Sequence, residues 1–117
     1  MDSNSHPLAN TSNLIAILIQ EFGWWWIGFY WVKYKGTIYE HLTLGQFQGP
    51  PACSKLFRGT GVCAAAWDQK KTVLLADVNT FEGHIACSSV SKSELVIPIE
   101  LEDEIVGVLD IDGAKYG

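Results

Sequence analysis

The sequence has little charge of either sign. Charged residues make up 18% of the 117 residues, below the ~25% usual in soluble domains. The eight lysines and arginines form no basic patch and the net charge is −5, so we expect no nucleic-acid partner. Apolar side chains reach 48%, which excludes a disordered chain. The combination suggests that something, such as a partner subunit, covers part of the apolar surface.

Long apolar runs and a secretion signal are also missing. Residues 14–32 are the most apolar stretch, but Gln20 and Glu21 divide it into pieces shorter than the ~20 residues that a spanning helix needs. The first ten residues lack the basic and then apolar pattern of a signal peptide. Three cysteines cannot all pair within one chain, which disfavours a disulfide-stapled secreted fold. We therefore expect one cytoplasmic domain over residues 1–117, with no membrane contact.

What the sequence does contain is a succession of strands and short helices. A helix over residues 14–22 follows a cap at Thr11, Ser12 or Asn13, and a second helix covers residues 62–70. Strands are expected at residues 24–34, 37–44, 72–76 (short and buried), 94–100 and 105–111. Long irregular segments at 45–61 and 77–93 separate them. Hairpins at both ends with helices between predict an α+β fold around an antiparallel sheet, with loops that roof a ligand pocket.

All three cysteines, Cys53, Cys63 and Cys87, lie in or next to the two long segments. Their spacing fits no zinc finger. Adding His84, three residues before Cys87, to the three cysteines makes a conceivable metal set, but we expect no metal. A free cysteine is often a small buried apolar residue, and Cys63 in its apolar run fits that interpretation. Cys87 lies in a polar, turn-like stretch, which does not fit it.

Three carboxylates follow in the C-terminal hairpin. Glu94 begins a strand, and Asp110 and Asp112 are two residues apart, so their side chains share one face of the next strand. They could mark a solvated strand end. A calcium loop lacks its third acidic ligand and closing glutamate. Carboxylates gathered on one face also suit a cationic ligand group, or a proton donor with a raised pKa.

An aromatic cluster occupies residues 24–31. Trp24, Trp26, Gly28 and Tyr30 alternate, so they share one face of the expected strand. Most of these aromatic side chains belong to a core or an interface, and one or two could wall a small-molecule pocket. A thiol beside carboxylates and aromatics is compatible with thiol redox chemistry, but the pattern does not name a substrate.

Six short blocks of the sequence resemble one enzyme family. They cover the chain from about Trp24 to Asp112 in register and include all three cysteines. The blocks are Trp26-Ile27-Gly28-Phe29-Tyr30, Gln48-Gly49-x-x-Ala52-Cys53, Gly59-x-Gly61-Val62-Cys63, Gly83-His84-Ile85-Ala86-Cys87, Ser91-x-Ser93-Glu94-Leu95-Val96-Ile97-Pro98 and Gly107-Val108-Leu109-Asp110-Ile111-Asp112. This set resembles the free methionine-(R)-sulfoxide reductases, which are single-domain GAF proteins.

The resemblance implies a GAF-like antiparallel sheet flanked by helices, a homodimer, and reduction of free methionine (R)-sulfoxide. It implies Cys87 as the nucleophile and Cys53 as its usual resolving partner, with Cys63 given a main role in some members. The acidic residues carried over are Glu94, Asp110 and Asp112, and the substrate-binding aromatics are Trp26 and Tyr30. No cofactor is implied beyond an external dithiol such as thioredoxin. The alternative is a GAF module that binds a small molecule or senses redox state without turnover.

Overall fold

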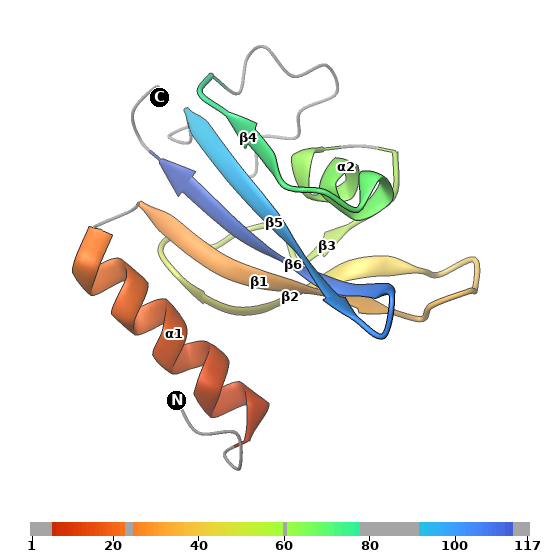
Figure 1. Ribbon diagram of the computed structural model, residues 1–117, viewed down its shortest axis with the longest axis horizontal. Coiled ribbons are helices and arrows are strands. Elements are labelled where there is room, and N and C mark those ends of the chain that lie inside the picture. Colours follow the sequence, from red (N-terminus) through yellow and green to blue (C-terminus); the bar gives the residue numbers. More distant parts are fainter. Residues whose placement is uncertain (1–5, 23–24, 60, 78–91, 114–117) are drawn as a thin grey trace.

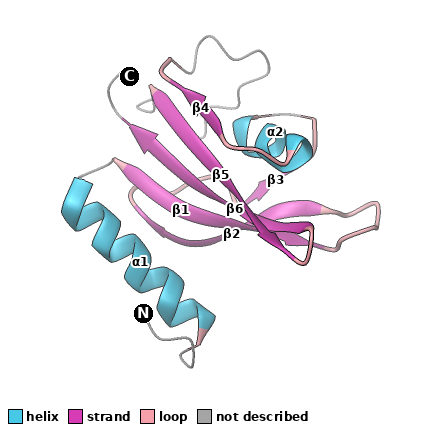
Figure 2. Cartoon of the chain, in the orientation of Figure 1, coloured by secondary structure: helices cyan, strands magenta, loops and turns pink. Residues whose placement is uncertain are grey.

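The computed structural model describes residues 6–22, 25–59, 61–77 and 92–113. These residues form two helices and one sheet (Figures 1 and 2). In chain order the elements are α1 (Pro7–Phe22), β1 (Trp26–Lys33), β2 (His41–Gln48), β3 (Lys55–Leu56), α2 (Val62–Gln69), β4 (Val73–Leu75), β5 (Ser93–Leu101) and β6 (Glu104–Gly113). The α+β fold expected from the sequence is confirmed.

The sheet is antiparallel, in the order β3-β2-β1-β6-β5-β4. The first and last hairpins therefore meet in its centre, where β1 pairs with β6. The turn between β5 and β6 uses Glu102 and Asp103, both with positive φ (52° and 65°). Two such residues make the turn whose twist matches a hairpin. A register shift between Ile99 and Glu100 then places Glu94 of β5 opposite Asp112 of β6.

The two helices cover opposite faces of the sheet (Figure 1). On the α1 face, Ile15 of the helix packs with Ile27, Phe29 and Ile111. On the other face, α2 residues pack with the strand residues that alternate with those of the α1 face. These strand residues include Trp26, Tyr30, Val96 and Val108. Because successive strand side chains point to opposite faces, the polar residues that alternate with the α1 core all lie on the α2 face.

Helix α1 begins at Pro7, earlier than the caps predicted at Thr11, Ser12 or Asn13. Proline is favoured in the first turn of a helix because it has no N–H to satisfy. The N–H of Leu8 instead donates to Nδ1 of His6 (3.0 Å). Thr11 lies inside the helix, where its hydroxyl donates to the carbonyl of Pro7 (2.9 Å). The Thr11 hydroxyl, one of the expected caps, therefore bonds to the carbonyl of the preceding turn instead of capping the helix.

The strand expected at residues 37–44 is wrong in its first half. Tyr34 and Gly36 have positive φ, and Thr37 and Glu40 close successive turns with backbone hydrogen bonds. Ile38, expected in a strand, is 91% exposed. The paired strand runs from His41 to Gln48 instead, so it takes in the first residues of the expected loop at 45–61, and β3 interrupts the rest of that loop.

The last boundaries differ less. The strand expected as buried at residues 72–76 is the edge strand β4, and Leu74 is 71% exposed because it has a neighbour on one side only. Helix α2 and the β5–β6 hairpin agree with expectation within two residues at each end. Most of the irregular segment expected at 77–93 lies outside the described residues. Neither described helix is long and apolar enough to cross a membrane.

Candidate active site

Three carboxyl groups gather on the α2 face of the sheet. Glu94 of β5 pairs directly with Asp112 of β6, and Asp110 lies two residues along on the same face. Glu94 is 8% exposed and Asp110 is 6% exposed. The prediction that Asp110 and Asp112 share a face is confirmed, whereas the alternative of a solvated strand end is wrong for Asp110. The sheet register adds Glu94 to them.

Burial raises the pKa of two of these carboxyl groups, and the charge of Glu94 raises both pKa values further. Desolvation is the largest cause for Asp112, followed by the charge of Glu94, and together they raise its pKa from 3.8 to about 8. The pKa of Asp110 is raised well above its usual value, first by burial and then by the charges of Glu94 and Asp112. Asp110 also hydrogen-bonds to both neighbours. At neutral pH the cluster therefore retains protons that ordinary carboxylates have lost.

Cys63 of α2 meets this cluster from the helix side. Its Sγ lies with carboxylate oxygens of Glu94 and Asp110 in a group whose atoms are all within 4.8 Å of one another. Burial raises the pKa of the Cys63 thiol well above 9, the nearby carboxyl groups raise it further, and the thiol hydrogen-bonds to Asp110. Cys63 is 3% exposed. It is a neutral thiol inside the core and a poor nucleophile, because the thiolate is the reactive form.

The same three groups are potential metal ligands. Thiolate and carboxylate oxygens both bind zinc, and Cys63, Glu94 and Asp110 are close enough together to share an ion. A metal bound here would have to displace the proton that burial holds on Cys63. His84 and Cys87, which completed the metal set considered from the sequence, lie outside the described residues.

Two oxygens of the cluster face no partner. Among the described residues, Oδ1 of Asp110 and Oδ1 of Asp112 are buried without a hydrogen bond. Buried polar atoms nearly always form a hydrogen bond, and a buried polar atom without one costs about 1–3 kcal/mol of stability. Two such oxygens on one face mark the place where a bound polar group would be held.

An aromatic wall stands beside the carboxyl groups. Trp26 of β1 lies opposite Asp112, and Gly28 lies opposite Asp110. Trp26 stacks with Tyr30 (ring centroids 6.2 Å apart) and with Phe47 (5.5 Å). A Cβ on Gly28 would come within 2.5 Å of the Trp26 ring, so only glycine lets the indole lie flat along the strand. The expected shared face is confirmed for Trp26, Gly28 and Tyr30, whereas Trp24, the fourth residue of that prediction, lies outside the described residues.

The chain segment that carries Cys53 is attached to this wall. The Tyr30 hydroxyl donates to the backbone carbonyl of Cys53 (2.8 Å), and Nε1 of Trp26 donates to the carbonyl of Pro50 (3.0 Å). Cys53 itself is half-buried. The structure therefore brings the Cys53 backbone to the aromatic residues, while Cys87 lies outside the described residues and its expected role stays a prediction.

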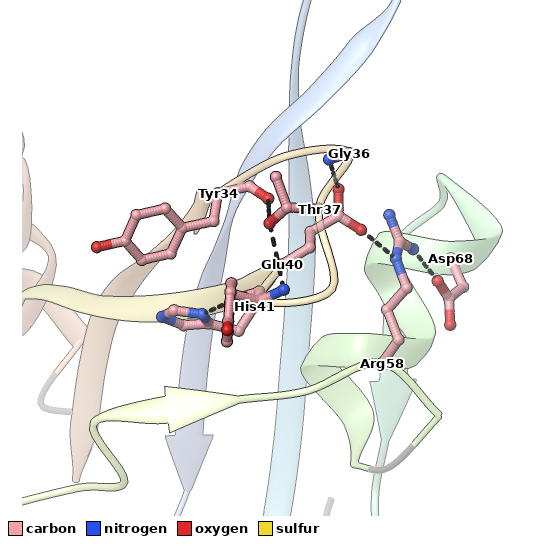
Figure 3. Close-up of polar contacts among 8 residues, drawn as sticks. Tyr34, Gly36, Thr37, Glu40, His41, Arg58 and Asp68 are labelled. Carbon is pink, nitrogen blue, oxygen red and sulfur yellow. Dashed lines mark hydrogen bonds and ion pairs between the residues drawn. The ribbon is translucent and has the colours of Figure 1, made fainter.

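Sequence reasoning missed Arg58, which ties three segments together (Figure 3). Its Nε donates to Glu40 in the β1–β2 turn (2.8 Å), and a terminal nitrogen pairs with Asp68 of α2. The guanidinium lies 3.5 Å from the centre of the Trp67 ring. Arg58 thereby fixes the far end of the segment that follows Cys53. An isolated arginine in a loop carries no periodicity or motif that could have identified it.

Comparison with known proteins was made by sequence and by structure. No family model matches the chain. It is 44% identical over 115 residues to GAF domain-containing protein A of Dictyostelium discoideum, covering 98% of this chain and 70% of that protein. It resembles the free methionine-R-sulfoxide reductase of Neisseria meningitidis, solved in complex with its substrate, at 43% identity and a TM-score of 0.87. That match covers 93% of this chain and 64% of the other.

A second solved structure agrees. The reduced form of fRMsr from Staphylococcus aureus is 42% identical with a TM-score of 0.88, and the match covers 98% of this chain and 72% of that one. The chain thus spans about two thirds of the length of these three proteins.

Proposed function

The chain belongs to the free methionine-R-sulfoxide reductase family and has its GAF fold, and from that premise we propose that it reduces free L-methionine (R)-sulfoxide to methionine. The observation that carries the proposal is the buried cluster of Asp110, Asp112 and Glu94 beside an aromatic wall. A sulfoxide oxygen leaves as water only if protons reach it, and this cluster holds protons at neutral pH.

The proposed first step is attack of the Cys87 thiolate on the sulfoxide sulfur. The Cys87 sulfur bonds to the sulfoxide sulfur while Asp110 or Asp112 protonates the oxygen. The S–O bond and the transient S–S bond then break as the hydroxyl group passes to the Cys87 sulfur. Methionine and a Cys87 sulfenic acid are the products. The sulfur of methionine is reduced by two electrons and that of Cys87 is oxidised by two. The raised pKa of Asp112, about 8, suits a donor that works near neutral pH.

The second step uses the thiol of Cys53. Its attack on the sulfenic acid forms a Cys53–Cys87 disulfide and releases water, and an external dithiol such as thioredoxin then reduces the disulfide. Cys63 is the other conceivable resolving thiol. Its burial and its raised pKa argue against that role: it stays protonated and hydrogen-bonded to Asp110, while Cys53 lies on a half-exposed segment.

Selectivity for the free amino acid follows from the unpartnered oxygens. A free methionine carries an α-ammonium group that Oδ1 of Asp110 or Asp112 can accept. The Trp26 and Tyr30 rings offer an apolar wall to the side chain and methyl group. A methionine inside a peptide has no ammonium, so it would leave these buried oxygens unpaired and bind more weakly.

The apolar composition also supports a homodimer. Ile38, Tyr39, Phe57 and Leu101 are all more than half exposed. We infer that pairing of two copies covers some of this surface and that the working enzyme is a cytoplasmic dimer with no bound cofactor.

The test is turnover of purified (R)-sulfoxide with dithiothreitol as reductant, measured as methionine by chromatography. The unmodified chain should turn over repeatedly, and Cys87→Ser should form no methionine. Cys63→Ser should still cycle, whereas Cys53→Ser should slow after the first turnover. Tight binding of methionine sulfoxide without any methionine formed would instead identify a sensing module. Full activity of Cys87→Ser would refute the proposed nucleophile.

A further inference from the structure

Hydrogen bonds from two strands attach the Cys53 segment to the sheet. Two consecutive carbonyl groups of the segment accept hydrogen bonds, one from β1 and the other from β2. The carbonyl of Cys53 accepts from the Tyr30 hydroxyl of β1 (2.8 Å), and the carbonyl of Ser54 accepts from the backbone N–H of Leu44 of β2 (3.0 Å). Tyr30 and Leu44 are themselves paired across the β1–β2 ladder. The paired residues Tyr30 and Leu44 thus hold the backbone at Cys53 and Ser54.

A third donor fixes the segment ahead of Cys53. Nε1 of Trp26 donates to the carbonyl of Pro50 (3.0 Å). Trp26 and Tyr30 are four residues apart on one face of β1, a separation of about 13 Å along a strand. Both side chains are only 2% exposed, so neither can swing away without opening the core. Cys53 therefore lies between two anchor points that belong to β1, an inner strand of the sheet.

We propose that Tyr30 is a positioning residue for Cys53, with Trp26 as the second anchor, and that the two hydrogen bonds set the rate at which Cys53 resolves the sulfenic acid. The inference rests on the proposed function. Disulfide formation requires the two Cβ atoms to approach ~3.5–4.5 Å with a defined dihedral angle. A misplacement of about 1 Å in a reacting group can cost as much as 100-fold in rate.

Two features of Tyr30 support this role over that of a simple wall residue. Its hydroxyl points to a backbone carbonyl of the Cys53 segment, so it contributes a donor as well as a ring. Burial raises the pKa of Tyr30 well above its usual value, so the phenol stays a donor at any pH at which thiol chemistry proceeds. The covalent step it would assist is balanced without a further reagent: Cys53–SH and the sulfenic acid give a disulfide and water.

The test separates the two chemical steps in a single turnover without reductant. Methionine release is followed by chromatography, and disulfide formation by quenching with an alkylating reagent and mass analysis. Tyr30→Phe should slow disulfide formation roughly 5–10-fold more than it slows methionine release, in keeping with the loss of one hydrogen bond to the Cys53 carbonyl. Dimedone should trap more sulfenic acid in this variant than in the unmodified chain.

Tyr39→Phe is the matched control. It also loses one phenol, but Tyr39 is 67% exposed, so both rates should equal those of the unmodified chain. Equal slowing of both steps in Tyr30→Phe, or no slowing of disulfide formation, would overturn the proposal. If Tyr30→Phe does not fold, Trp26→Phe is assessed by the same criteria, since it removes the indole donor and keeps a ring. An unmodified chain that released no methionine would instead overturn the proposed function.

Discussion

Replacing Asp112 with asparagine should make the folded protein more stable at neutral pH and leave its stability at pH 4 nearly unchanged. The folded state holds a proton on Asp112 up to about pH 8, whereas the unfolded chain releases it near pH 3.8. The stabilisation that the protonated Asp112 contributes to the folded state is therefore fully present below pH 3.8 and is lost as the pH rises toward 8. The amide has nearly the same shape, keeps an acceptor oxygen, and has no charge to bury.

The size of the effect follows from the pKa of Asp112. In the interval between 3.8 and about 8, each pH unit lowers the free energy of unfolding by about 1.4 kcal/mol. At pH 7 the loss from this one group is about 4 kcal/mol. Asp112→Asn should recover about 2–4 kcal/mol at pH 7, allowing for imperfect hydrogen bonds of the amide.

The assay is urea unfolding followed by tryptophan fluorescence between pH 4 and pH 8, with reductant present to keep the thiols uniform. Asp103→Asn is the control, because it removes the same charge from the exposed β5–β6 turn, and asparagine tolerates the positive φ found there (65°). It should change stability by less than about 0.5 kcal/mol at any pH. Equal pH dependence in Asp112→Asn and the unmodified chain would refute the reasoning about the buried carboxyl cluster.

Three further predictions follow from the site. Asp110→Asn should lower kcat by about 100-fold or more in the methionine assay, because it removes a proton donor; a change below threefold would contradict that role. Cys63 should react with N-ethylmaleimide at pH 7.5 roughly 100-fold more slowly in the folded than in the urea-unfolded chain, as measured by peptide mass analysis, because it is buried and its pKa is raised. Gly28→Ala should lower the urea-unfolding free energy by about 1–3 kcal/mol, because its Cβ would lie 2.5 Å from Phe47 Cβ and the Trp26 ring; unchanged stability would show that the wall can move.

The parts of the site that share one strand could be predicted from the sequence. The two-residue period of a strand placed Asp110 with Asp112, and Trp26 with Tyr30, on common faces. The short acidic turn also predicted that the strand of Glu94 pairs with that of Asp110. These patterns depend only on neighbouring residues, so tertiary contacts do not change them.

The parts that depend on tertiary contacts could not be predicted. The direction of Cys63 toward the carboxyl groups depends on how α2 packs on the sheet, and an apolar helix can bury several of its faces. The β2 boundary depends on Gly45, where a Cβ would lie 2.5 Å from Nε1 of Trp31. From the sequence Gly45 resembled the start of a loop, but it is a point of close approach within a strand. Arg58 acts through contacts with Glu40 and Asp68, which no local spacing reveals.

The most direct test of the central claim uses free L-methionine sulfoxide as a mixture of its two sulfur epimers, with dithiothreitol as reductant, followed by chromatography that separates the epimers. The account predicts that the (R)-epimer is converted to methionine, that the (S)-epimer remains, and that N-acetylmethionine (R)-sulfoxide, which lacks the ammonium, is reduced far more slowly. Consumption of both epimers, or equal rates for the free and acetylated (R)-sulfoxides, would contradict the roles given to the carboxyl cluster and the aromatic wall.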